Sequence, residues 1–269
     1  MDLIKVIKGP DKNNPYAVVY KPKELPSAPL SSDDMYNAFS QAAELFPQLL
    51  TVSGKKEIEH GLLHRLDTAT DGLILIAATQ DFYDYMISQQ EKGCFIKYYT
   101  ATCRLDFENP KLLENFPSFP YKDFLQAEIS AFFKSSENLL NLSDFKLESF
   151  FRPFGKGGKE VRPVTKDSGM AALKKTGKLK AYETQIISME KTDDTENVIV
   201  NCKISQGFRH QVRCHLAWAG LPILNDRLYN FAFRNSSGSE KVLEKLCFSA
   251  RKIEFFNPLE KQLKIFSCD

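Results

Sequence analysis

The segment HRLDTATDG at residues 64–72 contains a carboxylate that is placed where it could do chemistry. Asp67 comes shortly after Arg65 and just ahead of an apolar run that predicts a buried strand. A carboxylate in such a place can act as a base or as a nucleophile. An Asp in a turn also commonly accepts hydrogen bonds from the local backbone. This segment alone therefore leaves the catalytic and the structural interpretation open.

A second segment, QGFRHQVRCHLAWAGLPILND at residues 206–226, contains two arginines four positions apart. On a helix Arg209 and Arg213 would share one face, which is typical of a surface helix or a phosphate clamp. A buried Asp–Arg pair between the two segments would change both interpretations. The arginine would keep the carboxylate ionised, and exclusion of water would strengthen their interaction.

The stretch at residues 152–180 is strongly basic, although the net charge of the whole chain is only +2. Glu160 and Asp167 are its acidic residues. Such a stretch can neutralise several RNA phosphates, but the charge alone slightly favours a solvated loop. Its basic residues are Arg152, Lys156, Lys159, Arg162, Lys166, Lys174, Lys175, Lys178 and Lys180.

The elements that must position these residues follow from the apolar patterns and the turn residues. Strands are predicted at 16–21, 72–78, 95–105, 180–189, 198–204 and 252–256, and helices at 33–50, 81–92 and 206–219. Residues 106–177, which contain several prolines and glycines, are interpreted as a long irregular excursion from the core. This order is not a regular strand–helix alternation, so it predicts an α+β fold with a mostly antiparallel sheet.

The composition argues against several classes of protein. The longest clean apolar run, residues 73–78, is far shorter than the roughly 20 residues of a membrane helix. The first residues have no apolar core or cleavage site of a secretory signal, so a cytoplasmic protein without a membrane partner is expected. The six cysteines form no CxxC pair and predict reduced thiols. His210 and His215 lack the i,i+4 spacing of a helical zinc site, so no metal is predicted.

Five motifs, in order, resemble those of the RluA-type RNA pseudouridine synthases. YKPKELP (20–26) is similar to that family's NKPxGxP, HRLDTATDG to HRLDxxTSG, and KYYTA (97–101) to KxYxA. GFRHQVRCHLAWAGLPILND (207–226) resembles GRTHQIRVHLAxxGxPIxGD, and FSARKIEFFNP (248–258) resembles LHAxxLxFxHP. Any one of these motifs is weak, but together they span nearly the whole chain.

The resemblance implies a role for each matching residue. Asp67 matches the essential aspartate, Tyr99 the active-site tyrosine, and Arg213 the arginine that pairs with the aspartate. The remaining matches are implied to contact RNA or to lie near the flipped nucleotide. Four lysines of the basic stretch are added as RNA-binding candidates because of their charge. These residues are His64, Arg65, Arg209, His210, Gln211, Lys156, Lys159, Lys174 and Lys175.

The resemblance also implies the reaction and the architecture. Uridine in structured RNA, either rRNA or tRNA, would be flipped out, lose its N1–C1′ bond and rejoin through C5. This redox-neutral isomerisation requires no cofactor. The implied fold is a single catalytic domain over 1–269, with a central sheet, flanking helices and an active-site cleft. It would carry an insertion at about 106–177, no N-terminal accessory RNA-binding domain and no obligatory protein partner, as a monomer.

Several positions depart from the family's pattern. Phe208 replaces the first arginine of GRTHQIR, with Arg209 in the next position. Asp71 replaces the usual Ser, Tyr20 the usual Asn, Asn225 the usual Gly and Ser249 the usual His. None of these changes removes Asp67, Tyr99 or Arg213, but they suggest a divergent branch and leave the RNA target open.

Two other functions compete with this interpretation. The first is an RNA-binding protein on the same fold that has lost catalysis, against which the retained Asp67, Tyr99 and Arg213 argue. The second is a hydrolase in which Asp67 and Asp71 bind a metal ion, which no histidine or further carboxylate cluster in the sequence supports.

Overall fold

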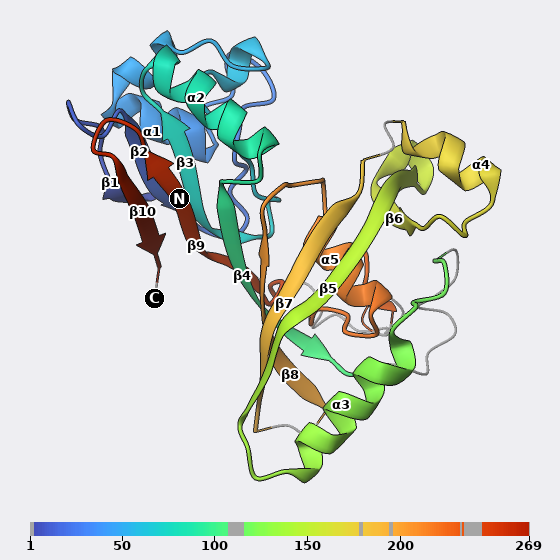
Figure 1. Ribbon diagram of the computed structural model, residues 1–269. Coiled ribbons are helices and arrows are strands. Elements are labelled where there is room, and N and C mark those ends of the chain that lie inside the picture. Colours follow the sequence, from blue (N-terminus) through green and yellow to red (C-terminus); the bar gives the residue numbers. More distant parts are fainter. Residues whose placement is uncertain are drawn as a thin grey trace. The chain divides into compact units, whose positions relative to one another are not determined.

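The computed structural model describes residues 3–106, 116–177, 180–193, 196–231, 233 and 244–268. The chain divides into two compact units, the first made of Met1–Tyr99 with Ser249–Asp269 and the second of Thr100–Phe248. The chain passes between the units within strands β4 (Ile96–Arg104) and β9 (Phe248–Asn257) (Figure 1). No described helix is both long enough and apolar enough to cross a membrane.

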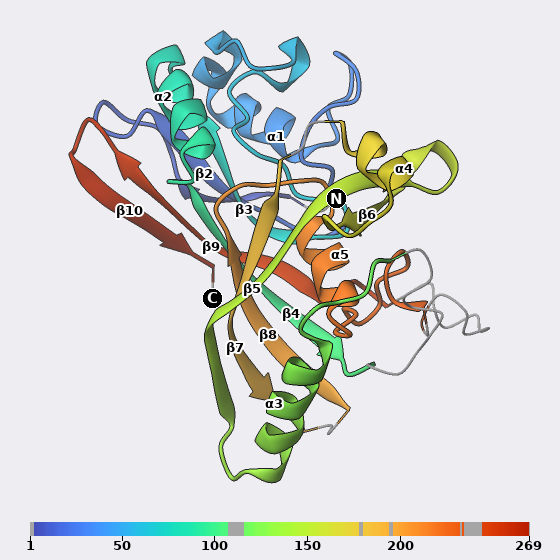
Figure 2. The same ribbon diagram turned by 45° about the vertical axis from the view of Figure 1, so that its right-hand side comes forward.

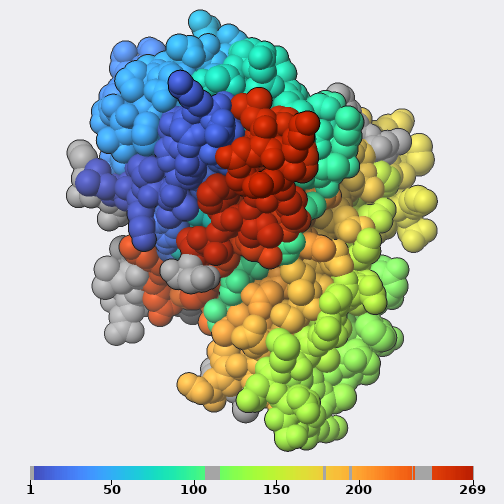
Figure 3. All heavy atoms as spheres, turned by 60° about the vertical axis from the view of Figure 1, so that its left-hand side comes forward, coloured from blue at the N-terminus to red at the C-terminus, as the bar shows by residue number. Residues whose placement is uncertain are grey.

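The first unit is built on a mixed sheet in which β3 occupies a central place. Its neighbours are β2, which is antiparallel to it, and β9, which is parallel. β1 extends the sheet beyond β2, and β10 pairs with β9. These strands are β1 (Lys5–Lys8), β2 (Tyr16–Lys21), β3 (Asp71–Ala77) and β10 (Gln262–Ser267). Figure 3 shows segments from the two ends of the chain side by side in this unit.

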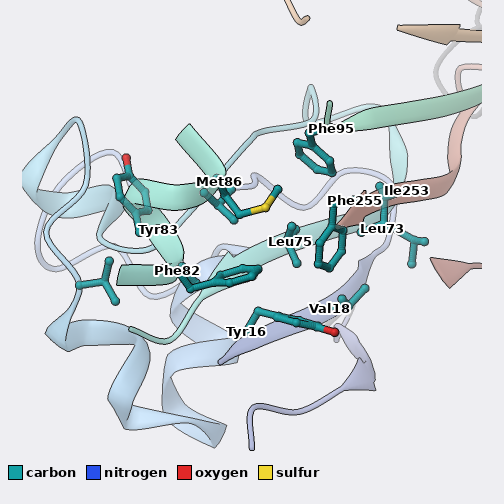
Figure 4. Close-up of a cluster of buried hydrophobic side chains, with 13 residues drawn as sticks. Tyr16, Val18, Leu73, Leu75, Phe82, Tyr83, Met86, Phe95, Ile253 and Phe255 are labelled. Atoms are coloured by element: carbon teal, nitrogen blue, oxygen red, sulfur yellow. The ribbon is translucent and has the colours of Figure 1, made fainter. Parts of the chain in front are cut away.

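Burial explains why DGLILIA forms the strand β3. All seven of its residues are buried, as expected for a continuous apolar run that is covered on both faces of a sheet. One face packs on helix α2 (Gln80–Glu91) through Phe82 and Met86. Tyr16 stacks on Phe82 with ring centroids 5.0 Å apart, and Phe255 closes the cluster (Figure 4).

The helix predicted at 33–50 is shorter than expected. Helix α1 is Ala38–Leu45, because the Asn37 side chain caps it by accepting from the Ser40 amide. Asp34 lies in the preceding turn, where it accepts from the Leu30 and Tyr36 amides. Two 3₁₀ turns follow, η1 (Pro47–Thr51) and η2 (Glu57–Glu59).

The second unit contains an antiparallel sheet whose strand order from β4 is β8, β7, β5 and β6. The strands are β5 (Leu139–Phe154), β6 (Glu160–Val164), β7 (Tyr182–Lys191) and β8 (Asn197–Ile204). Helices α3 (Lys122–Lys134), α4 (Met170–Leu173) and α5 (Gln211–Trp218) belong to it, with the 3₁₀ turns η3 (Lys156–Gly158) and η4 (Lys174–Thr176) (Figure 2).

The predicted α+β class and mostly antiparallel pairing are confirmed, but two expectations for this unit were wrong. The region 106–177 was interpreted as an irregular excursion with some strand content; it contains the strands β5 and β6, and β5 pairs with β7, but the helix α3 was not expected there. Alternation along β5 is hidden by its mixed polarity. The helix at 206–219 has the arginine spacing typical of a surface helix, yet every residue of α5 is buried.

Candidate active site

The loop that carries Asp67 is held by a buried lysine. Lys21, at the end of β2, has no exposed surface. Its Nζ donates to the carbonyl oxygens of Pro22 at 2.9 Å, Leu25 at 2.7 Å and Thr68 at 3.1 Å. An ammonium group has three N–H donors, so all three are used, and one of them holds the carbonyl of Thr68, the residue after Asp67.

Other contacts from the same segment hold the backbone of the residues on both sides of Asp67. The Glu24 amide also donates to the Thr68 carbonyl, at 2.8 Å. The Ser27 hydroxyl donates to the Leu66 carbonyl at 2.7 Å and accepts from the Leu66 amide at 2.9 Å. The half-buried Asp67 therefore lies on a loop whose backbone is held before and after it.

The charge of Lys21 is balanced by nearby carboxylates. Burial lowers the pKa of Lys21 to about 8, while the negative charges of Asp71, Asp67 and Glu24 act to raise it. At pH 7 the amine is therefore mostly protonated and can donate to all three carbonyls. Lys21 was not predicted as a site residue from the sequence, although it lies in the YKPKELP motif.

His64 and Arg65, predicted to lie near the flipped nucleotide, have partners within the first unit. His64 Nε2 accepts from the Leu75 amide at 3.1 Å, so its proton lies on Nδ1. Burial and the charge of Lys97 lower the pKa of His64 to about 3, which keeps it neutral. Arg65 is exposed and forms an ion pair with Glu59 at 2.9 Å. Their contacts with RNA stay predictions.

Tyr99 lies in β4, where buried and partly exposed residues alternate. Lys97 and Tyr99 point to the same side of the strand and are both buried. The Lys97 ammonium lies 4.6 Å from the centroid of the Phe95 ring, and burial lowers its pKa to about 8. Tyr99 and Asp67 belong to the same unit.

Arg213 has a carboxylate partner that the sequence analysis did not single out. Its Nε and Nη2 donate to the two oxygens of Asp226, each at 2.8 Å. Both side chains are buried, and Asp226 also accepts from the amides of Leu228 and Tyr229. Asp226 ends the PILND motif, which was the available signal. The expected pairing of Arg213 with Asp67 joins residues of two separate units and stays a prediction.

The residues just before α5 are engaged in the second unit. Arg209, although exposed, donates to the carbonyl oxygens of Gly158 and Glu160. His210 Nδ1 lies 3.0 Å from the Tyr229 hydroxyl. The buried Gln211 donates to the Glu183 carbonyl at 2.8 Å, which favours a positioning role over direct RNA contact.

Phe208 has an aromatic environment that an arginine would not fill. Its ring stacks on Phe151 with centroids 5.0 Å apart, and the Tyr182 ring lies 5.1 Å away. Phe208 therefore extends the hydrophobic cluster around Phe151. This packing accounts for the departure from the family's first arginine.

The basic stretch at 152–180 differs from the expected mobile loop. Residues 152–164 form the β5–β6 hairpin, and Gly155, Gly157 and Gly158 supply the positive φ angles of its turn. Arg162 is buried, pairs with Glu160 at 2.7 Å and lies over Phe154, so it is not available to phosphate. The four candidate lysines are exposed, whereas Lys178 lies outside the described residues. They are Lys156, Lys159, Lys174 and Lys175.

The described residues contain no group of three or more His, Cys, Asp or Glu side chains arranged to hold a metal ion. The metal-dependent alternative therefore finds no ligand set in that part of the chain. All six cysteines are free thiols.

Comparisons with known proteins agree on one family. The family model described as RNA pseudouridylate synthase matches residues 15–218. RNA pseudouridine synthase 7 of Arabidopsis thaliana is 27% identical over 184 residues, which cover 66% of this chain and 37% of that protein. RNA pseudouridine synthase 7 of Oryza sativa subsp. japonica is 27% identical over 198 residues, covering 70% of this chain and 40% of that protein. The match thus spans less than half of either relative.

Solved structures share the fold at low sequence identity. Human RNA pseudouridylate synthase domain containing 1 superposes with a TM-score of 0.59 at 14% identity, over 99% of this chain and 83% of that one. Human RNA pseudouridylate synthase domain containing 4 gives 0.53 at 18% identity, over 97% and 87%. These similarities support the predicted fold.

The Arg213–Asp226 pair generates a stability prediction. Arg213→Ala should lower the free energy of unfolding by about 3–5 kcal/mol, because it leaves a buried carboxylate without its charged partner. The change is measured as a shift of the urea unfolding curve. Arg213→Ala/Asp226→Ala removes both charges and should be less destabilised than the sum of the two single variants. Parent-like unfolding of Arg213→Ala would contradict the assigned pair.

Proposed function

Since the chain belongs to the RNA pseudouridylate synthase family, we propose that it isomerises uridine in RNA to pseudouridine, with Asp67 as the catalytic carboxylate. The observation that carries this proposal is the loop at 64–71, in which the backbone of the residue before Asp67 is held by Ser27 and the carbonyl of the residue after it by Lys21 and Glu24. Such restraint of a half-buried carboxylate suits catalysis, which depends on accurate placement of the reacting group.

The proposed reaction conserves atoms and electrons. The N1–C1′ bond of uridine breaks, the base rotates, and a C5–C1′ bond forms. The C5 proton is lost, and N1 gains a proton. An ionised Asp67 would attack the sugar or remove a proton from it, and both routes fit the residues present. Tyr99 would stack on the base, and its hydroxyl is a candidate acceptor for the C5 proton.

The substrate proposed is a structured RNA, either rRNA or tRNA, whose target uridine is flipped out of its stack before reaction. We propose that both units together form one catalytic domain, which acts as a cytoplasmic monomer without an obligatory protein partner. The exposed lysines at 156, 159, 174 and 175 would bind backbone phosphates, which gives affinity without sequence choice.

Asp67→Asn should abolish isomerisation and leave the fold intact. Asparagine keeps the shape of the side chain but is neither a base nor a good nucleophile. Activity is measured as tritium release from RNA transcribed with C5-tritiated uridine, and the expected loss is at least about 10²–10⁴-fold. Unfolding curves should match those of the parent.

The matched control is Asp33→Asn, which changes an exposed Asp outside the loop and should release tritium at the parent rate. Near-normal turnover by Asp67→Asn would overturn the assignment of Asp67. A parent that binds RNA but releases no tritium from any of the cellular RNAs tested would favour the non-catalytic RNA-binding alternative.

Neutralising the four exposed lysines should weaken RNA binding. Changing Lys156, Lys159, Lys174 and Lys175 to Gln together should flatten the dependence of log Kd on log salt by up to about one unit per lost phosphate contact. The set of modified uridines should stay the same, because phosphate contacts carry no sequence information.

The control is a set of four exposed lysines in the first unit changed to Gln in the same way, which gives an equal loss of charge. These are Lys12, Lys55, Lys92 and Lys261. An unchanged salt slope in the first quadruple variant, or an equal change in both, would mean that the basic stretch is only a solvated surface.

A further inference from the structure

Three of the departures from the family's pattern, Tyr20, Asp71 and Ser249, meet in one hydrogen-bonded group. The Tyr20 hydroxyl donates to Asp71 Oδ2 at 2.6 Å, and the Ser249 hydroxyl donates to Asp71 Oδ1 at 2.7 Å. They come from β2, β3 and β9, and the three residues lie far apart in the sequence. Residues that depart from the pattern at distant positions of the sequence thus contact one another in the structure.

The backbone brings these residues together at the point where three strands begin or end. Asp71 pairs with Ser249, and the next residue, Gly72, pairs with Lys21 and Ala250. Gly72 has a φ of 133°, and a Cβ there would lie 2.2 Å from the Ala250 carbonyl oxygen. Only glycine allows β9 to approach so closely, and Asp71 is buried as a result.

The group is matched in its donors and acceptors. A buried carboxylate needs partners for both of its oxygens, and here each oxygen accepts from one hydroxyl. Lys23 adds a positive charge 3.6 Å from Oδ1. Burial acts to raise the pKa of the Asp71 carboxyl. The hydrogen bonds from Tyr20 and Ser249 and the charge of Lys23 outweigh it and lower this pKa below its usual value.

Asp71 is also the residue that ends the Asp67 loop. The Thr70 amide donates to the Asp67 carbonyl at 3.0 Å, so a single turn separates the two carboxylates along the chain. Lys21 holds the middle of that turn through Thr68, and the charge of Asp71 helps to keep Lys21 protonated.

We propose that Asp71 is a positioning residue for Asp67, and that Tyr20, Asp71 and Ser249 act as one hydrogen-bonded group that anchors the end of the catalytic loop. This inference rests on the proposed role of Asp67. This group takes the role of Asn, Ser and His at the same positions of the family's pattern. Its three members can be replaced by those residues only when all three are replaced together.

The first test is rescue by restoring the whole set. Asp71→Ser should lower kcat by about tenfold or more, because small displacements of a catalytic group are costly, while KM for RNA changes less than about twofold. Tyr20→Asn/Asp71→Ser/Ser249→His should regain most of the lost kcat. A parent-like kcat for Asp71→Ser, or a triple variant that is no better than the single one, would overturn the proposal.

The pH profile gives a readout that a merely structural role would not move. Asp71→Asn removes a negative charge that raises the pKa of Lys21, so the alkaline fall of kcat should move to lower pH than in the parent. Asp67 and Glu24 also face Lys21, and Lys23 faces Asp71; all three are unchanged. Burial alone places the pKa of Lys97 in the same range, so an alkaline fall of kcat caused by Lys97 would not shift in Asp71→Asn. An alkaline fall that does not shift therefore contradicts the proposal.

Hydrogen–deuterium exchange separates failure of this inference from failure of the proposed function. In Asp71→Ser the amides of residues 66–70 should exchange about tenfold faster or more, while those of α2 stay protected as in the parent. This result is expected even if the parent isomerises no RNA. Parent-like exchange at 66–70 would overturn the positioning role whether or not the parent is active.

Discussion

The ammonium group of Lys21 is buried, and its three N–H groups donate to the carbonyl oxygens of Pro22, Leu25 and Thr68. Burying a charge is unfavourable unless hydrogen bonds and opposite charges compensate for it. The backbone must therefore turn around the Lys21 Nζ atom, and Glu24 adopts a positive φ of 65° within that turn. The shape of the 21–27 segment and the shape of the Asp67 loop are consequently fixed by the same group.

The constraint also explains why distant parts of the sequence match one family together. YKPKELP supplies Lys21 and is followed directly by Ser27, HRLDTATDG supplies the loop that these two residues hold, and the FSA of FSARKIEFFNP supplies Ser249 beside Asp71. Each motif supplies one partner of a contact whose other partner lies in a different motif. A substitution at one partner therefore requires a substitution at the other. Tyr20, Asp71 and Ser249 show this, since each departs from the pattern and each bonds within the same group. The second unit has a parallel case, in which Phe208 replaces an arginine and packs on Phe151.

Much of the fold could be predicted from the sequence because local signals were strong. β3 is continuously apolar, α2 ends before Gly93, and β7 and β8 are separated by a polar turn. β5 was missed because its mixed polarity hides the alternation and prolines suggested a loop. At the site, motif position predicts Asp67 as the catalytic carboxylate. Asp226 could not be assigned to Arg213 from the sequence, because only the folded chain brings residues 213 and 226 into bidentate contact. Burial of Arg162 among aromatic rings was likewise invisible in a count of charges.

The claim that Lys21 holds the catalytic loop is tested most directly by the kcat of Lys21→Met, with Lys12→Met as an exposed control. Methionine has a similar length and is flexible enough to fill the site, but it donates no hydrogen bond to Thr68. In protein that retains a cooperative unfolding transition, the account predicts a kcat for tritium release at least about tenfold below that of the parent, with unchanged affinity for RNA. A parent-like kcat in Lys21→Met would contradict the account.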